Sequence, residues 1–227
     1  MKTRLPKGLI VSVILLIPFL GLAHGVSSSD QEILNNGGLW AYIWVGAKHM
    51  VTGYDHLLFL AGVIFYLSGL RDIIRFITVF TLGHSITLIG ATYLGVRADE
   101  HLVDAVIALS VFYKGFENLG GFEKWLHRSS PNLLWMVFSF GLIHGLGLST
   151  RLQSFDMGTA QFLPKIISFN VGVELGQIAA LIPIVFLITR WQGKDSYNAF
   201  YKAANTYLVI AGIALCIYQL YGYFYGH

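Results

Sequence analysis

The sequence predicts an all-α fold: a polytopic transmembrane helix bundle with six spans in the mature protein and a signal-like segment before them. The first observation is composition, because 55% of the 227 residues are hydrophobic and only 12% are charged, about half the charged share of a typical soluble domain. The second is distribution, since the apolar residues form runs near the ~20 residues that cross a bilayer. We therefore expect an integral protein of the lipid bilayer.

The N-terminal residues 1–23 have the pattern of a secretory signal peptide. Basic residues precede a short apolar core, and small residues lead up to Ala23, where a signal peptidase would cut. After cleavage the mature chain would begin at His24, and residues 24–38 would form a polar segment on the outer side of the membrane. An uncleaved first helix is the alternative interpretation.

Six apolar segments follow and form the predicted transmembrane domain, residues 39–227. The connecting loops are short, so consecutive helices should pack as antiparallel neighbours in one bundle. The first and fifth segments are long enough to tilt or to include an interfacial turn. The predicted spans are residues 39–69, 74–95, 102–121, 133–150, 163–189 and 200–224.

Aromatic residues mark the ends of several spans in turn. Trp40 and Trp44 open the first span, Trp125 follows the third, Trp191 follows the fifth, and the aromatic run 221–225 closes the last. These amphipathic rings favour the interface between membrane and water. Their positions therefore support the predicted span limits.

Basic residues in the loops predict the orientation of the bundle. The side with more lysine and arginine should face the cytoplasm, which places both mature termini in the periplasm of a multi-pass protein of the bacterial inner membrane. The predicted cytoplasmic set is Arg71, Arg75, Lys124, Arg128, Arg190, Lys194 and Lys202, and the predicted outer set is Arg97, Arg151 and Lys165.

The composition also excludes several classes of function. A formal net charge of +3 is small and its basic residues are scattered, so nothing indicates nucleic-acid binding. The single cysteine, Cys216, rules out a disulfide framework and a thiolate metal cluster within one chain. Metal ligands would therefore have to be histidine, carboxylate, amide or backbone groups. The chain carries no nucleotide-binding motif.

A first group of ionisable residues lies within the first predicted span. In a continuous helix His49, Gly53 and His56 would follow an i, i+4, i+7 stripe, so both imidazoles would point to one side. Such groups are costly inside a bilayer and are functional candidates. Asp55 would lie roughly 100° around the helix from His56, so we expect it to accept an imidazole N–H, or to bind metal directly if Gly53 loosens the turn.

Further polar residues lie at a similar depth in later spans. A lone buried histidine usually bonds to a neighbouring helix, but four imidazoles and two carboxylates at one level predict a transition-metal site. Imidazole suits nickel and cobalt, and also zinc and copper. The metal-ligand candidates are His49, Asp55, His56, His84, His144 and Glu174, and the pathway or supporting candidates are Ser85, Glu117, Asn118, Asn170 and Gln177.

Two of these candidates have simpler explanations. Ser85 beside His84 could be a nucleophile, but hydroxyls in such helices usually bond back to the backbone. Glu117 lies three residues after Lys114 on one helix face, so an internal ion pair is as good an explanation as a place on a cation pathway.

The ordered motifs resemble the HupE/UreJ family of hydrogenase and urease accessory membrane proteins over nearly all of residues 40–190. More distantly, they resemble nickel/cobalt permeases with a His-Asp-His signature. The resemblance implies handling of nickel or cobalt as the bound ion, with metalloenzyme-maturation proteins as partners. The motifs are His49-xxx-Gly53-x-Asp55-His56, Phe80-Thr-Leu-Gly83-His84-Ser85, Ala108-Leu-Ser110 with Glu117-Asn118, Phe140-Gly-Leu-Ile-His144-Gly-Leu-Gly147 and Phe169-Asn170-x-Gly172-Val-Glu174-Leu-Gly176-Gln177.

These observations predict a divalent transition-metal permease rather than an enzyme. One alternative is an intramembrane zinc hydrolase, in which Asp55 or Glu174 would act on a metal-bound water. The other is a metal-binding accessory subunit that does not transport. A polar path that continues to the cytoplasmic end would favour the permease, and a pocket for an acyl chain would favour the hydrolase.

Overall fold

The computed structural model describes the chain except for residues 1–29, 31, 35–36, 68, 154–161 and 227, and except for the side chains of Tyr54, Asp55 and Phe162. The predicted signal peptide, residues 1–23, and its cleavage site therefore lie outside the described residues, as does much of the segment 24–38. Every regular element in the described part is a helix. The predicted all-α fold is thus confirmed for that part of the chain.

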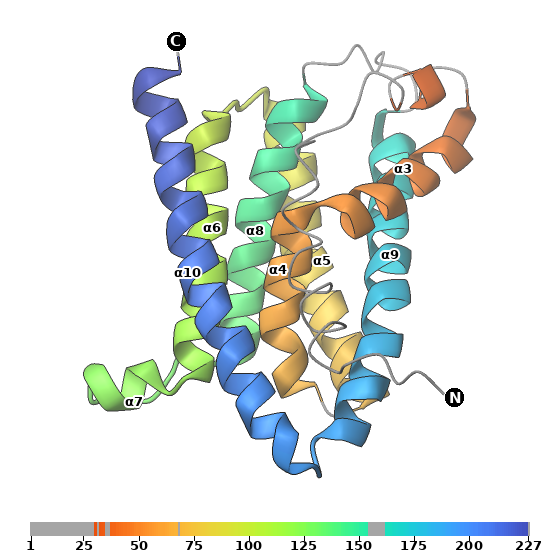
Figure 1. Cartoon of the computed structure of the whole chain (residues 1–227). Helices are drawn as coiled ribbons and strands as arrows, with labels where there is room; N and C mark the ends of the chain where they lie inside the picture. Colours follow the sequence, from red (N-terminus) through yellow and green to blue (C-terminus); the bar gives the residue numbers. More distant parts are fainter. Residues whose placement is uncertain (1–29, 31, 35–36, 68, 154–161, 227) are drawn as a thin grey trace, which may run out of the picture.

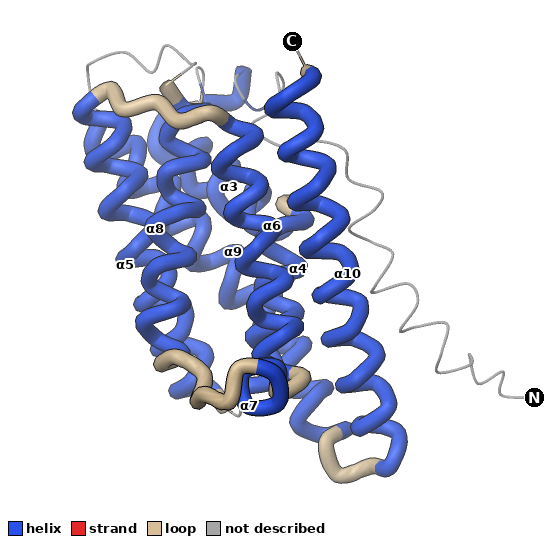
Figure 2. Tube along the Cα trace, turned by 90° about the vertical axis from the view of Figure 1, so that its left-hand side faces the viewer, coloured by secondary structure: helices blue, strands red, loops and turns tan. Residues whose placement is uncertain are grey.

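Four helices in the described residues are long and apolar enough to cross a membrane. They stand side by side with α6 in one bundle, and the short α7 (Gly121–Trp125) lies across one end of it (Figures 1 and 2). The four helices are α5 (Leu70–Leu94), α8 (Leu133–Leu152), α9 (Phe162–Trp191) and α10 (Asp195–Tyr225). They correspond to the second, fourth, fifth and sixth predicted spans.

The other two predicted spans have more complicated structures. The third is α6 (Glu100–Asn118), which carries Asp104, Lys114 and Glu117 as buried residues and so exceeds the charge content of an ordinary span. The first, predicted as residues 39–69, is divided between two helices. A count of six spans therefore stays a prediction, whereas four are supported by length and composition.

The predicted first span is interrupted at Gly53. Helix α3 (Gly38–Thr52) ends there and α4 (Tyr54–Val63) begins, followed by a 3₁₀ turn, Ile64–Tyr66. Gly53 has φ −68° and ψ 111°, an extended conformation between two helical segments. Consequently α3 is inclined to the axis of α4 (Figure 1). The continuous stripe expected for His49, Gly53 and His56 is wrong, because the helix does not pass through Gly53.

Close backbone contact holds the helices in pairs, α5 with α8, α3 with α9 and α6 with α10. A Cβ atom added to Gly141 on α8 would lie 2.3 Å from the carbonyl oxygen of Phe80 on α5. On α9, one added to Gly172 would lie 2.0 Å from the carbonyl oxygen of Ile43 on α3. Larger side chains at these glycines would force the helices apart. Glycine therefore allows the close approach of α5 to α8 and of α3 to α9.

The distribution of polarity is that of a membrane protein. Several polar side chains are completely buried, among them Lys114, Gln177 and Asn205, each 0% exposed. Large apolar side chains face outward, such as Leu187 at 65% and Ile217 at 63% exposed. An apolar solvent around the bundle accounts for both features, because it favours apolar surface and offers no hydrogen bonds. The chain is a multi-pass membrane protein.

The alternation of the helices separates the two sets of loop charges. One end of the bundle holds α7 and the α9–α10 connection, which carry Lys124 and Lys194 (Figures 1 and 2). The opposite end holds the C-terminus and the connection between α5 and α6, which carries Arg97. We call these the basic end and the outer end. The assignment of the basic end to the cytoplasm remains a prediction of the loop charges.

Cysteine labelling tests this orientation. With the native Cys216 replaced by serine, a cysteine introduced for Lys194 should react with a membrane-impermeant maleimide only in permeabilised cells, whereas one introduced for Arg97 should react in intact cells. The matched pair controls for reactivity, since both sites lie in exposed loops. Labelling of the Lys194 site alone in intact cells would reverse the orientation.

Candidate metal-binding site

The break at Gly53 brings two imidazoles into hydrogen-bond contact, with their rings edge-on to one another at 74°. His49 lies in the last turn of α3 and His56 in the first turns of α4, and their Nε2 atoms are 3.1 Å apart. Two nitrogens bound to one tetrahedral ion at about 2.0–2.1 Å would be roughly 3.3 Å apart. In this contact one nitrogen donates its proton to the other. The pair therefore has nearly the spacing of two ligands of one ion.

A third imidazole, His144, approaches from α8. Its ring centroid lies 4.9 Å from that of His56, and the residue is 2% exposed. The Nδ1 atom is 2.7 Å from the carbonyl oxygen of Phe140. A carbonyl can only accept, so Nδ1 carries the proton, and in the neutral ring the lone pair is on Nε2. This tautomer is the one in which a metal would bind through Nε2.

The fourth imidazole, His84 on α5, is held by an amide of α9. His84 is 1% exposed, and its Nδ1 is 2.9 Å from Oδ1 of Asn170. The amide group cannot be turned around, because its Nδ2 donates to the carbonyl oxygen of Ile166 at 3.2 Å. His84 therefore also carries its proton on Nδ1. The supporting role of Asn170 at a metal site stays a prediction.

The four imidazoles form what we call the histidine cluster: His49, His56, His84 and His144. They come from α3, α4, α5 and α8 and are held by ring contacts and hydrogen bonds. Within the described residues no group of three or more histidine, cysteine, aspartate or glutamate side chains is close enough to hold a metal ion as it stands. A bound ion would require the rings to turn toward a common point.

The remaining predicted residues are less closely placed. The side chain of Asp55 lies outside the described part. Glu174 on α9 is half-buried, and so is Ser85 on α5. Gln177 is 0% exposed and accepts a 3.4 Å hydrogen bond from Thr81 on α5. Thr81 was not predicted, although it precedes His84 by one helical turn.

Aromatic rings close the basic side of the histidine cluster. Phe59 lies 5.2 Å from Phe140, 5.9 Å from Phe80 and 5.8 Å from His144, measured between ring centroids. Phe59 and Phe80 are each 1% exposed. We call these rings, Phe59, Phe80 and Phe140, the aromatic floor. Composition alone indicated apolar spans but did not predict this layer, because its members come from three helices.

Glu117 and Asn118 belong to a second cluster nearer the basic end. Glu117 accepts a 2.6 Å ion-paired hydrogen bond from Lys114, so the ion-pair interpretation of the sequence is correct for the described structure. Asn118 donates to the carbonyl oxygen of Gly62 at 2.8 Å and to Oδ1 of Asn205 at 2.5 Å. Helices α4, α6 and α10 meet at this cluster.

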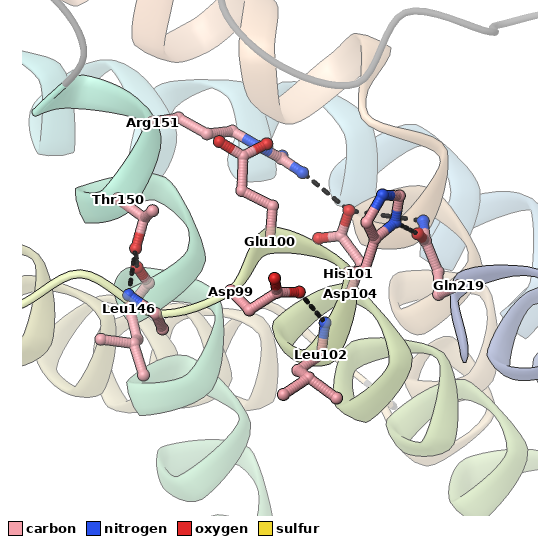
Figure 3. Close-up of polar contacts among 10 residues, drawn as sticks. Asp99, Glu100, His101, Leu102, Asp104, Leu146, Thr150, Arg151 and Gln219 are labelled. Carbon is pink, nitrogen blue, oxygen red and sulfur yellow. Dashed lines mark hydrogen bonds and ion pairs between the residues drawn. The ribbon is translucent and has the colours of Figure 1, made fainter. Parts of the chain in front are cut away.

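A third polar group at the outer end was not predicted. Arg151 of α8 pairs with Asp104 of α6 at 2.7 Å, and Gln219 of α10 donates to the same carboxylate oxygen at 3.4 Å (Figure 3). His101 lies 2.8 Å from Oε1 of Gln219 and donates to it. The network joins α6, α8 and α10. It lies nearer the outer end than the histidine cluster, because Arg151 follows His144 by two turns on α8.

The chain was compared with known protein families and proteins. A family model described as HupE / UreJ protein matches residues 14–226, nearly the whole chain. No curated protein and no solved structure matches.

Removal of the Asn170 amide tests the positioning of His84. Asn170→Leu should weaken Co²⁺ binding to the purified protein about 10–100-fold, because the His84 ring loses the acceptor that holds its tautomer and orientation. Asn170→Asp keeps an acceptor and should weaken binding less. Titration calorimetry measures both. Equal affinity in the leucine variant and the parent would separate His84 from the metal site.

Proposed function

The chain belongs to the HupE/UreJ family, whose members have accessory or transport roles in nickel or cobalt handling at membranes, and on this premise we propose that it is a permease for a divalent transition metal. The histidine cluster is the proposed binding site for the transported ion, with nickel or cobalt as the favoured substrate. The observation that carries the proposal is the meeting of the His49 and His56 Nε2 atoms at 3.1 Å across a broken helix.

The broken helix favours a cation at this point. Transporters commonly bind ions where a helix is discontinuous, because unwound backbone and half-helix C-termini offer carbonyl oxygens. Here the C-terminal turn of α3, with its partial negative charge, ends beside His49. Imidazole ligands with Nε2 as acceptor add the preference for a transition metal.

A route for the ion can be proposed from the order of the polar groups. Arg151 and Asp104 stand at the outer end, the histidine cluster follows, and Glu117 with Asn118 lies beyond the aromatic floor. A dehydrated cation needs such stations, because an apolar stretch of several turns is a high barrier. Phe59 and its neighbours would have to move aside during passage.

We place the protein in the bacterial inner membrane with both mature termini in the periplasm, and we propose metalloenzyme-maturation proteins as recipients of the ion. The basic residues at the α9–α10 end support this orientation. An accessory subunit that binds metal without transport, or a zinc hydrolase that uses Glu174, would show metal binding without flux. Flux is therefore the decisive property.

Replacement of His56 tests the binding site. His56→Ala should abolish stoichiometric binding of Ni²⁺ or Co²⁺, measured by elemental analysis after dialysis, because the ion loses one of two closely spaced nitrogens. His127→Ala is the matched control, since this exposed histidine lies in the loop after α7. Equal metal content in the His56 variant and the parent would exclude the histidine cluster as the site.

A second variant tests passage toward the basic end. Glu117→Gln should leave metal binding by the histidine cluster nearly unchanged and slow uptake of labelled nickel or cobalt into proteoliposomes, because the second station loses its charge. Parent protein that binds metal but shows no flux under any proton or sodium gradient would refute the permease. In that case a hydrolase or an accessory subunit would remain.

A further inference from the structure

The Lys114–Glu117 ion pair is buried far more completely than an ordinary structural pair requires. The two side chains are 1% and 4% exposed, and the ammonium also lies 3.9 Å from the centroid of the Tyr66 ring. Desolvation of two charges is costly, and apolar residues of similar volume often stabilise a protein as well or better. Burial of this pair therefore costs free energy, and packing alone gives no reason for it.

Hydrogen bonds around the pair orient the Asn118 amide without ambiguity. Asn205 donates its Nδ2 to the carbonyl oxygen of Tyr201 at 2.8 Å, so its Oδ1 must face Asn118. Asn118 in turn donates its Nδ2 to that oxygen and to the carbonyl oxygen of Gly62. Both partners can only accept, so the Asn118 group cannot be reversed.

This arrangement leaves a buried oxygen in need of a positive partner. Asn118 is 7% exposed, and among the described residues its Oδ1 has no hydrogen-bond partner. The hydroxyl of Tyr113 is likewise buried and has no hydrogen-bond partner among the described residues. Tyr113 precedes Glu117 by one turn on the same face of α6. A buried acceptor without a donor costs free energy, and a cation would satisfy it.

We propose that this cluster is a second cation site and that the Lys114 ammonium is its tethered occupant. A mobile divalent cation would displace the ammonium from Glu117 and bind the carboxylate together with Asn118 Oδ1. Oxygen ligands hold nickel and cobalt less strongly than imidazole, so this is a station suited to release. The proposal rests on the proposed function only in taking the transported metal as that cation.

Charge removal at position 114 tests the site directly. In a His56→Ala background, which removes binding by the histidine cluster, Lys114→Met should create stoichiometric Co²⁺ binding in the purified protein, measured by equilibrium dialysis. Lys114→Arg keeps the tethered charge and should create none. Lys114→Met combined with Glu117→Gln should lose the new binding, because the carboxylate is its main ligand.

The outcomes separate this site from transport. Co²⁺ binding by the Lys114→Met protein no greater than in its background would refute the site, whether or not the parent transports metal. Absence of flux in the parent would refute the permease and leave the binding result unaffected. The Lys114→Met protein could aggregate while its combination with Glu117→Gln stays monodisperse. In that case Co²⁺ or Mg²⁺ added during purification should keep the Lys114→Met protein monodisperse. Aggregation of this protein in the presence of every cation would equally refute the site.

Discussion

The structure depends on one constraint: a polar group inside this bundle must find its partner within the protein, because the surrounding bilayer supplies none. Several of these groups meet the constraint through contacts between helices that are far apart in sequence. His84 bonds to Asn170, Asp104 to Arg151 and Asn118 to Asn205. Each contact needs two helices in the correct axial register, and these polar groups therefore help to specify a single packing of the bundle.

Glycine makes that register possible. At Gly141 and Gly172 the helix backbones approach so closely that a Cβ atom would overlap a carbonyl oxygen of the neighbouring helix. Both residues stand within about one turn of a polar residue of the site, His144 or Asn170. The close contacts thus bring together the helices that carry the imidazoles and the Asn170 amide. Small residues and candidate site residues therefore belong to the same helix contacts.

The polar groups form three levels along the bundle, separated by apolar packing. The Arg151–Asp104 network and the Lys114–Glu117 cluster both involve α6 and α10, whereas the histidine cluster draws on α3, α4, α5 and α8. Phe59 belongs to α4, which also supplies the Gly62 carbonyl to Asn118. A movement of α4 would therefore alter the histidine cluster, the aromatic floor and the second cluster together. This short helix is the element that contacts all three.

The sequence by itself determined the membrane character, the helical fold, the family and the residue types of the candidate site, because these follow from composition, apolar run length and local motifs. Only the tertiary structure decided how the site is built. Periodicity assumes an unbroken helix, so it placed His49 and His56 on a stripe, whereas the extended Gly53 joins their rings across a break. The partners of His84 and Asp104 lie 86 and 47 residues away. Such pairs depend on the axial register between helices, which a pattern along one chain does not contain.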